Sequence, residues 1–371
     1  MLFQGLTSTI RHELLHALGF SASLYAFFRD ENGEPRTPRD EIGKPPIDFD
    51  LRVRKWSENT IIKTTRPWKV RGGFLNKTVN LMVTPRVLQE VRDHFGCPDL
   101  EGAELEDQGG DGTAITHWEK RIFQDEAMTG TVHTKDPAYS RLTFALLEDT
   151  GWYMPNYQYV SLFNSPINTD PDYISAYFQA QEIAWGRNLG CDFARKSCKA
   201  LMEASDTYPF CRDIMSSGSA KTSCTFDATA IGSCNLVQFG STLPPLYQNF
   251  DDIEGIDPKE IGTVGASVTL ADFCPYIQEF TWKSQGTSRG TRCQDFDNQP
   301  TDENNYALED YGIGSMCFEQ AGPWTQRSCS MLKQWQRYGG GNLGVYFNKN
   351  LKRYLIRCLM ICFMTILTIS W

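Results

Sequence analysis

The segment HELLH, residues 12–16, constrains the fold of this 371-residue chain more than any other feature of the sequence. Apolar residues around it recur at helical spacing from Leu6 to Leu18, which predicts a helix, and Gly19 stands where a left-handed helix terminator is expected. Residues four positions apart lie on one helix face, so the imidazoles of His12 and His16 can offer nitrogens to one tetrahedral Zn²⁺. The alternative, a helix with two unrelated surface histidines, is disfavoured because a chance HExxH is rare in a chain with five histidines.

A catalytic zinc site needs a third protein ligand and an open position for water. The compact metzincin pattern would put a histidine at position 22, but Ala22 stands there, so the third ligand must come from elsewhere. The remaining candidates are His94, His117 and His133. Only His117 lies between a glycine-rich turn and a methionine that can pack beneath a metal, Met128, so we favour His117.

The composition is that of a folded protein and excludes one class of partner. Hydrophobic residues make up 41% of the chain, which is enough for a sizeable core. The net charge is −9 and there is no sustained run of Lys and Arg, so the chain lacks the positive surface that nucleic-acid binding requires. We therefore expect no nucleic-acid partner.

The twelve cysteines indicate an oxidising compartment. All but Cys358 and Cys362 lie between Cys97 and Cys329, and none forms a CxxC pair of the kind found in zinc ribbons and thioredoxin-like sites. Cysteines spaced in this way predict a disulfide framework, so we expect those between Cys97 and Cys329 to be mostly oxidised. The spacing does not select a connectivity.

Local patterns beyond the first helix predict a mixture of helices, strands and loops. Residues 29–50 are charged and rich in Pro and Gly, which favours an exposed loop, and residues 101–112 predict an acidic, glycine-rich turn. Residues 85–94 and 137–150 have helical periodicity, whereas β-branched residues at 60–65 favour a strand.

Four segments are distinctive beyond the first motif: HELLHALGFSASLYAFFRDENGEPRTPRD, LEGAELEDQGG, THWEKRIFQDEAMTG and AWGRNLGCDFARKSC. Together they resemble the leishmanolysin family of metzincin zinc endopeptidases, most closely its animal branch. The resemblance implies an α+β fold in which a metzincin-type catalytic core, with zinc helix, long insertion, Met-turn and C-terminal helix, precedes a cysteine-rich, disulfide-stabilised domain. We assign the core to residues 1–155, with the insertion at about 21–111, a boundary near 155–171, and the cysteine-rich domain to 172–340.

The resemblance also implies the residues of the site. It assigns His12, His16 and His117 as ligands of one Zn²⁺ per chain, Glu13 as the general base, and Met128 as the methionine of the Met-turn. The implied activity is that of a zinc-dependent metalloendopeptidase acting on protein or peptide substrates. Zinc would lower the pKa of the attacking water, and Glu13 would take the water's proton and pass it to the leaving amine.

Acidic residues near the third ligand are candidates for orienting the imidazoles. Glu119, Asp125 and Glu126 can accept hydrogen bonds from imidazole N–H groups, although such residues are more often solvated charges or structural partners. A function of another class is a non-catalytic cell-adhesion or protein-binding module that retains a zinc site. The intact HELLH argues against that alternative.

The sequence departs from the family pattern at both ends. The family's N-terminal subdomain, whose sheet edge holds an extended substrate, is expected to be missing, so we expect the chain as written to hydrolyse peptides poorly or not at all. Residues 341–371 form an atypical tail that ends in the apolar segment Leu355–Trp371. This segment is short for a membrane span and has the layout of a lipid-anchor signal, but we favour read-through or mis-spliced sequence.

The expected location follows from the cysteines and from the resemblance. Cysteine usage favours the secretory pathway, with an extracellular or cell-surface, membrane-associated protein, although no signal peptide is recognised after Met1. The resemblance also suggests a cytoplasmic location and a link to cell adhesion. No oligomeric state is predicted.

Overall fold

The computed structural model describes residues 2–110, 112–131, 137–157, 183–205, 208–214, 221–284, 286–301, 305, 309–319, 324–327, 335–338 and 343–347. The chain divides into two compact units, the first made of Met1–Phe210 and Gln238–Cys274, and the second of Cys211–Val237 and Pro275–Trp371. The first unit thus includes residues 183–205 and 238–274, which fall inside the range assigned from the sequence to the cysteine-rich domain.

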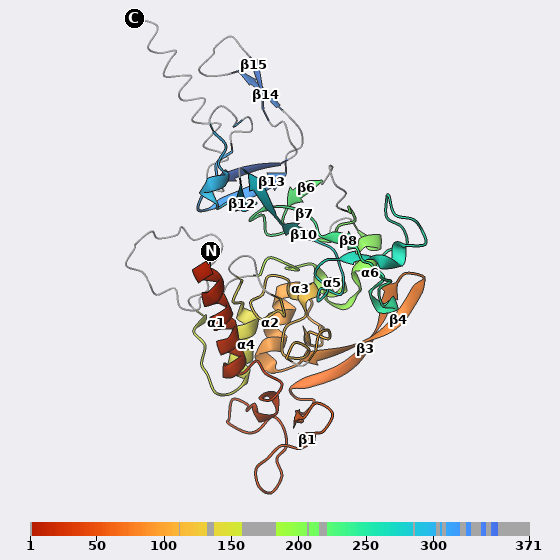
Figure 1. The fold of residues 1–371 in the computed structure, drawn as a ribbon. Coiled ribbons are helices and arrows are strands. Elements are labelled where there is room, and N and C mark those ends of the chain that lie inside the picture. Colours follow the sequence, from red (N-terminus) through yellow and green to blue (C-terminus); the bar gives the residue numbers. More distant parts are fainter. Residues whose placement is uncertain are drawn as a thin grey trace, which may run out of the picture. The chain divides into compact units, whose positions relative to one another are not determined.

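The first unit begins with the predicted helix, α1, which spans Leu2–Leu18 (Figure 1). Gly19 does not adopt the left-handed conformation predicted for it. The amides of Gly19 and Phe20 both donate to the carbonyl of Leu15, so the helix ends without a positive φ angle. A Cβ atom on Gly19 would lie 2.9 Å from Cγ2 of Thr150, so the glycine is required by close packing rather than by its backbone angles.

A three-stranded antiparallel sheet supports the rest of the first unit. Its order is β3 (Ile61–Val70), β4 (Gly73–Met82) and β5 (Ala103–Leu105), and β3 and β4 form a long hairpin (Figure 1). Trp118 continues the sheet through isolated bridges, antiparallel to Leu105 and parallel to Thr129. The sheet therefore reaches the residue that follows His117.

The acidic turn predicted at 101–112 is wrong in part, because β5 lies inside it and buries its carboxylates. Glu104 and Glu106 are almost fully buried. Glu104 forms ion pairs with Lys77 on β4 and with Arg121, which are far from it in sequence. Local composition suggests an exposed turn here because these compensating cations are not local.

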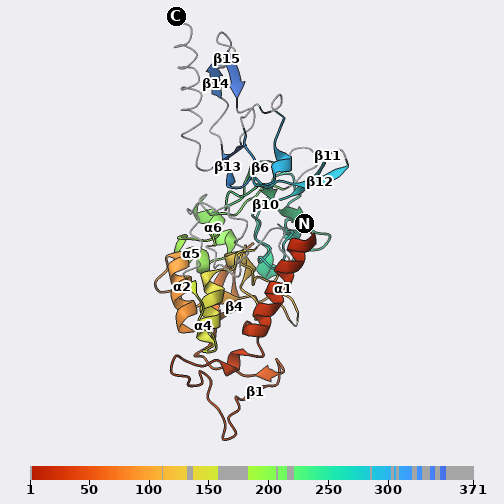
Figure 2. The same ribbon diagram turned by 90° about the vertical axis from the view of Figure 1, so that its left-hand side faces the viewer.

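Several short helices accompany the sheet in the first unit. The predicted helices at 85–94 and 137–150 are present as α2, Pro85–Phe95, and α4, Arg141–Asp149; the second begins only after Ser140, whose side chain caps its first turn. These two helices lie side by side (Figure 2). The remaining elements of this unit's described residues are η1 (Tyr25–Phe27), β1 (Ile47–Asp48), β2 (Val53–Arg54), α3 (Lys120–Phe123), α5 (Gly190–Arg195), α6 (Cys198–Ala204), η3 (Pro245–Tyr247), η4 (Ile261–Thr263) and β9 (Val264–Ala266).

The core of the first unit is rich in aromatic side chains. Phe95 of α2 contacts Phe123 of α3 and Phe193 of α5, and Trp118 contacts both Phe123 and Phe20. All five rings are fully buried. This cluster joins the end of α1 to the strand-like segment that follows His117, and so fixes their separation.

The second unit is built mainly of short strands. β6 (Thr222–Cys224), β7 (Ile231–Cys234) and β10 (Ile277–Glu279) form an antiparallel sheet in the order β10-β7-β6. Three two-stranded pairs accompany it, formed by β11 (Thr281–Ser284) with β12 (Thr287–Gly290), β13 (Ser315–Glu319) with β16 (Leu343–Phe347), and β14 (Trp324–Arg327) with β15 (Trp335–Tyr338). The unit also contains η5, Phe296–Asn298, and the strand β8, Leu236–Gln238, crosses the limit between the units.

The prediction of disulfide bonds is confirmed. The described residues contain four, two in the first unit and two in the second: Cys97–Cys191, Cys198–Cys274, Cys211–Cys234 and Cys224–Cys317. Cys293 is a buried thiol in the second unit. The remaining cysteines, Cys329, Cys358 and Cys362, lie outside the described residues.

The described residues confirm a mixed α and β protein stabilised by disulfides, whereas the metzincin arrangement stays a prediction. Most of the predicted boundary at 155–171 lies outside the described residues, as does the apolar end of the tail. Among the helices of the described residues, none is both long and apolar enough to cross a lipid bilayer.

Candidate metal centre

Three imidazoles meet at one point in the first unit. The Nε2 atom of His12 lies 3.1 Å from Nε2 of His16 and 3.1 Å from Nε2 of His117, and the last two atoms are 3.2 Å apart. His12 and His16 come from one face of α1, as the helical spacing predicts, and His117 comes from the segment that extends the sheet. The structure thus brings together the three histidines selected from the sequence.

The other ring nitrogen of each histidine is anchored to the main chain. Nδ1 of His12 donates to the carbonyl of Ala127 at 2.7 Å, and Nδ1 of His16 donates to the carbonyl of Phe20 at 2.7 Å. Nδ1 of His117 donates to the carbonyl of Thr113 at 2.9 Å. Because a carbonyl oxygen only accepts, these partners assign the proton to Nδ1 and leave Nε2 unprotonated on every ring.

Three unprotonated nitrogens that face one another repel unless a cation lies between them. A tetrahedral zinc ion with Zn–N distances of about 2.0–2.1 Å would place neighbouring nitrogens about 3.3 Å apart. The observed triangle of 3.1–3.2 Å is close to that spacing. The residues present therefore fit a metal ion held by three neutral imidazoles.

Burial favours the neutral form of two of the rings. Burial lowers the pKa of His117 to about 4; the hydrogen bond to Thr113 opposes this change, and the neighbouring imidazoles of His16 and His12 contribute to it. Burial also lowers the pKa of His12. At neutral pH these rings are unprotonated and available as metal ligands.

The loop before His117 is held in place from two sides. The hydroxyl of Tyr25 in η1 donates to the carbonyl of Ile115 at 2.9 Å, and Ile115 itself donates to the carbonyl of Glu106. Ile115 has a φ angle of 68°, a strained conformation for a β-branched residue. These contacts direct the chain so that His117 faces the two histidines of α1.

Glu13, the predicted general base, lies on α1 between the two histidines and is exposed to solvent. Its charge acts on His12, whose pKa it raises against the larger effect of burial. The carboxylate is thus near the imidazole of His12 and open to water. This position suits a group that exchanges protons with water.

Met128 is fully buried beside the metal centre. Its carbonyl accepts from the amide of Trp118, and the preceding residue, Ala127, accepts from His12. The turn that contains Met128 therefore contacts both segments that carry the imidazoles. A Cβ atom on Gly130 in the same turn would lie 3.6 Å from Cγ of His117, which shows how closely the turn approaches that ring.

The suggestion that Glu119, Asp125 or Glu126 orients an imidazole directly is wrong. Each Nδ1 atom donates to a main-chain carbonyl instead. The Glu119 side chain accepts from the amide of Arg121 and caps α3, while Glu126 accepts from Ser140 and Thr143. Every residue type has a main-chain carbonyl that can accept a hydrogen bond from an imidazole, so the sequence contains no signal for these partners.

A buried ion network around Lys77 was not foreseen from the sequence. Lys77 has no exposed side-chain surface and pairs with Asp272 at 2.6 Å, with Asp107 at 3.4 Å and with Glu104 at 3.7 Å. Arg121 also pairs with Asp272, at 3.1 Å. The carboxylates raise the pKa of Lys77 well above its ordinary value, although burial opposes this. The network lies next to the main chain of His117, whose carbonyl accepts from the amide of Glu106.

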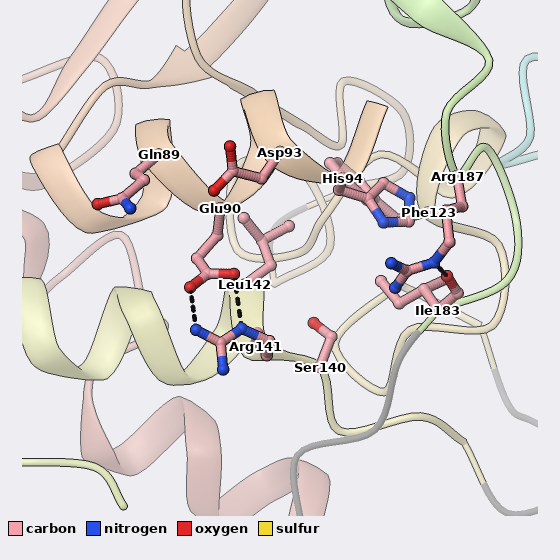
Figure 3. A pocket seen from close by; sticks show the side chains of 10 residues that line it. All are labelled: Gln89, Glu90, Asp93, His94, Phe123, Ser140, Arg141, Leu142, Ile183 and Arg187. Carbon is pink, nitrogen blue, oxygen red and sulfur yellow. Dashed lines mark hydrogen bonds and ion pairs between the residues drawn. The ribbon is translucent and has the colours of Figure 1, made fainter. Parts of the chain in front are cut away.

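The other candidate ligands lie elsewhere. His94 lines a separate cavity of about 220 Å³ between α2 and α4 (Figure 3). Its Nε2 donates to the carbonyl of Trp185 at 2.9 Å. Glu90 and Arg141 form a two-point ion pair across the same cavity (Figure 3). His94 therefore does not join the three imidazoles. His133 lies outside the described residues.

Comparison with known proteins identifies a family that matches most of the chain. Residues 3–327 match the family described as leishmanolysin, a peptidase family. Similar proteins named leishmanolysin-like peptidase occur in Drosophila pseudoobscura pseudoobscura, at 49% identity over 347 residues, and in Caenorhabditis elegans, at 45% over 353 residues. The matches cover 91% of this chain, with 48% and 50% of the respective relatives.

More distant similarity extends to the protein named leishmanolysin from Leishmania donovani. It is 27% identical over 281 residues, which are 75% of this chain and 35% of that protein. The chain thus spans about half the length of the first relatives that it matches, and a smaller share of the distant one. A peptidase family of metal-dependent enzymes implies a metal cofactor, and the imidazole cluster is a group of side chains that could hold a metal ion.

Proposed function

Because the chain belongs to the leishmanolysin family of peptidases, we propose that it is a zinc-dependent metalloendopeptidase whose metal is held by His12, His16 and His117. The observation that carries the proposal is the convergence of three Nε2 atoms within 3.2 Å of one another, each on a ring whose Nδ1 is anchored to a carbonyl. Three neutral imidazoles with an open fourth position are characteristic of catalytic zinc. We assign one Zn²⁺ to each chain.

The chemistry is divided between the metal and Glu13. When bound, zinc supplies a positive charge that acidifies a water molecule and polarises the scissile carbonyl of the substrate. The Glu13 carboxylate accepts a proton from the attacking water and passes it to the amine that leaves. Since the water is the nucleophile, no covalent bond forms between the chain and the substrate.

The remaining residues keep the ligands in place. The carbonyls of Ala127, Phe20 and Thr113 hold the three rings in one tautomer and one orientation. Met128 fills the space under the site as the methionine of the Met-turn. The substrates are proteins or peptides, and the four disulfides support a route through an oxidising compartment.

A cleavage assay on unstructured peptides tests the proposal. As expected from the sequence, the 371-residue chain should cleave them poorly or not at all, and a longer form that spans the full length of its relatives should cleave them readily. A chelator should abolish the activity, and added zinc should restore it. The variant Glu13→Gln should lose at least about a hundred-fold in rate, the usual contribution of general acid–base catalysis, while it keeps its zinc. The matched control His94→Gln lies away from the imidazoles and should remain active. Zinc binding with no cleavage even by the longer form would support the adhesion or protein-binding module instead.

A further inference from the structure

One peptide unit connects a buried carboxylate to a ring of the metal centre. The carbonyl of Ala127 accepts from Nδ1 of His12 at 2.7 Å. The amide N–H at the other end of the same peptide bond, which belongs to Met128, donates to Oε2 of Glu126. A peptide unit is planar and rigid, so a side chain that holds its N–H also sets the direction of its C=O.

The carboxylate of Glu126 is itself fixed from the other side. Glu126 has no exposed surface. Its Oε1 atom accepts from the amide of Ser140 at 3.2 Å, from the hydroxyl of Ser140 at 2.7 Å and from the hydroxyl of Thr143. These donors lie at the first turn of α4, so the carboxylate joins that helix to the turn next to the metal centre.

The same hydrogen bonds reach the third ligand. The hydroxyl of Thr143 accepts from Nε1 of Trp118 at 2.9 Å, and the amide of Trp118 donates to the carbonyl of Met128 at 2.9 Å. Trp118 directly follows His117 in the chain. Glu126 therefore lies in one connected set of bonds with two of the three ligand-bearing segments.

A carboxylate in this place affects His12 in two ways. It holds the Ala127 carbonyl where the imidazole must donate, which fixes the ring and its tautomer. By accepting from the amide it also polarises the peptide group, so the carbonyl becomes a stronger acceptor and the imidazole a stronger ligand. Metal sites often show a carboxylate bonded directly to a ligating histidine, and here a peptide unit stands between the two.

We propose that Glu126 is a positioning residue of the metal centre, which acts on His12 through the Ala127–Met128 peptide unit. The proposal rests on the proposed function only in taking His12 as a zinc ligand. It assigns Glu126 a role that differs from that of a buried hydrogen-bonding group that merely stabilises the fold. The two roles differ in what happens to His12 when the carboxylate is changed.

The variant Glu126→Gln keeps the size of the side chain but replaces one accepting oxygen by a donating NH₂ group. It cannot satisfy both Met128 and the Ser140 and Thr143 donors. We expect its zinc dissociation constant, measured by chelator competition, to rise about ten-fold or more, as for other residues that orient metal ligands. The ¹⁵N chemical shift of Nδ1 in His12 should move as well.

Asp149→Asn is the matched control. Asp149 is also buried and its Oδ2 accepts from two main-chain amides, those of Arg86 and Val87 at the start of α2, away from the three imidazoles. This variant should lose stability and keep the zinc affinity and the His12 shift of the native chain. Equal zinc affinity in Glu126→Gln and the native chain, or the same loss in Asp149→Asn, would overturn the proposal.

Two further measurements test the role of Glu126 if the first variant does not fold or if the native chain binds no zinc. If Glu126→Gln does not fold, Thr143→Val can replace it, because it removes one donor to the carboxylate and should weaken zinc binding a few-fold. Thr143→Ser keeps the hydroxyl and should bind zinc with the affinity of the native chain. Equal zinc affinities of the two variants would count against the proposal. If the native chain binds no zinc, the proposed function fails. The ¹⁵N shift of His12 in the metal-free native and Glu126→Gln chains then still decides the positioning role, since an unchanged shift contradicts it.

Discussion

His12 donates from Nδ1 to the carbonyl of Ala127 over 2.7 Å, although 115 positions separate the two residues in the chain. This bond fastens the helix that carries two of the imidazoles to the turn that contains Met128. It leaves Nε2 of His12 free of a proton and directed at His16 and His117. Main-chain carbonyls therefore orient the three rings of the proposed metal centre.

Stability toward acid should depend on His94. Burial lowers the pKa of this ring to about 4 in the folded chain, against an ordinary value of 6.5. Below pH 6.5 the unfolded chain takes up a proton that the folded chain does not, so the contribution of His94 to stability is complete above pH 6.5 and is lost as the pH falls toward 4. The loss should total about 3 kcal/mol, because one pKa unit is worth about 1.4 kcal/mol.

The variant His94→Gln checks this prediction, because its amide can still donate to the carbonyl of Trp185. Urea unfolding of the variant should show a shallower loss of stability between pH 6.5 and 4 than the native chain shows. Parallel curves for the two chains over that range would contradict the assignment.

Lys77 should be essential for the stability of the first unit. Lys77→Met would deprive the buried carboxylate of Asp272 of its nearer cation, and it would also remove one of the cations that pair with Glu104. Removing one partner of a buried pair costs about 3–5 kcal/mol, so urea unfolding should show a decrease of that size. Lys69→Met on the same hairpin breaks only the partly exposed pair with Glu203 and should cost less than about 1 kcal/mol. Similar effects of the two substitutions would refute a special role of the buried network.

The disulfide pattern can be checked directly. Peptide mapping of the unreduced chain should recover the pairs Cys97–Cys191, Cys198–Cys274, Cys211–Cys234 and Cys224–Cys317. Burial raises the pKa of the Cys293 thiol to about 12, so this residue should resist alkylation at neutral pH until the chain is unfolded. Rapid alkylation of Cys293 in the native chain, or other pairings among the eight cysteines, would disagree with the structure.

Gly19 should tolerate no side chain. Gly19→Ala would bring a methyl group within 2.9 Å of Thr150, so we expect a loss of about 1–3 kcal/mol in the free energy of unfolding. Gly110→Ala is the control, since a Cβ atom there would meet nothing within 4 Å, and it should change stability little. An unchanged melting temperature for Gly19→Ala would show that α1 shifts easily relative to α4.

The sequence predicts the parts of the site that depend on the spacing and succession of residues along the chain. The four-residue spacing of His12 and His16 requires only a helix, and His117 was favoured because of its order between a glycine-rich turn and Met128. Contacts between distant segments were not predictable in this way. The carbonyls that orient the rings belong to Phe20, Thr113 and Ala127, and no property of those side chains marks them.

The errors have the same origin. The acidic residues Glu104 and Glu106 suggested an exposed turn, but both side chains are buried. The cations that pair with Glu104, Lys77 and Arg121, come from other elements, so the local sequence does not reveal them. Gly19 has the position of a helix terminator in the sequence, but its role comes from Thr150 at the end of α4. In both cases the physical reason for a residue lies in a partner that belongs to another element of the structure.

The zinc content of the purified chain tests the central claim most directly. After dialysis against metal-free buffer, elemental analysis should find one zinc per native chain. His117→Ala should retain almost none, because two helix histidines alone bind zinc weakly, whereas His94→Gln should retain one. A native chain that holds no zinc, or a His117→Ala chain that holds as much as the native one, would contradict the account.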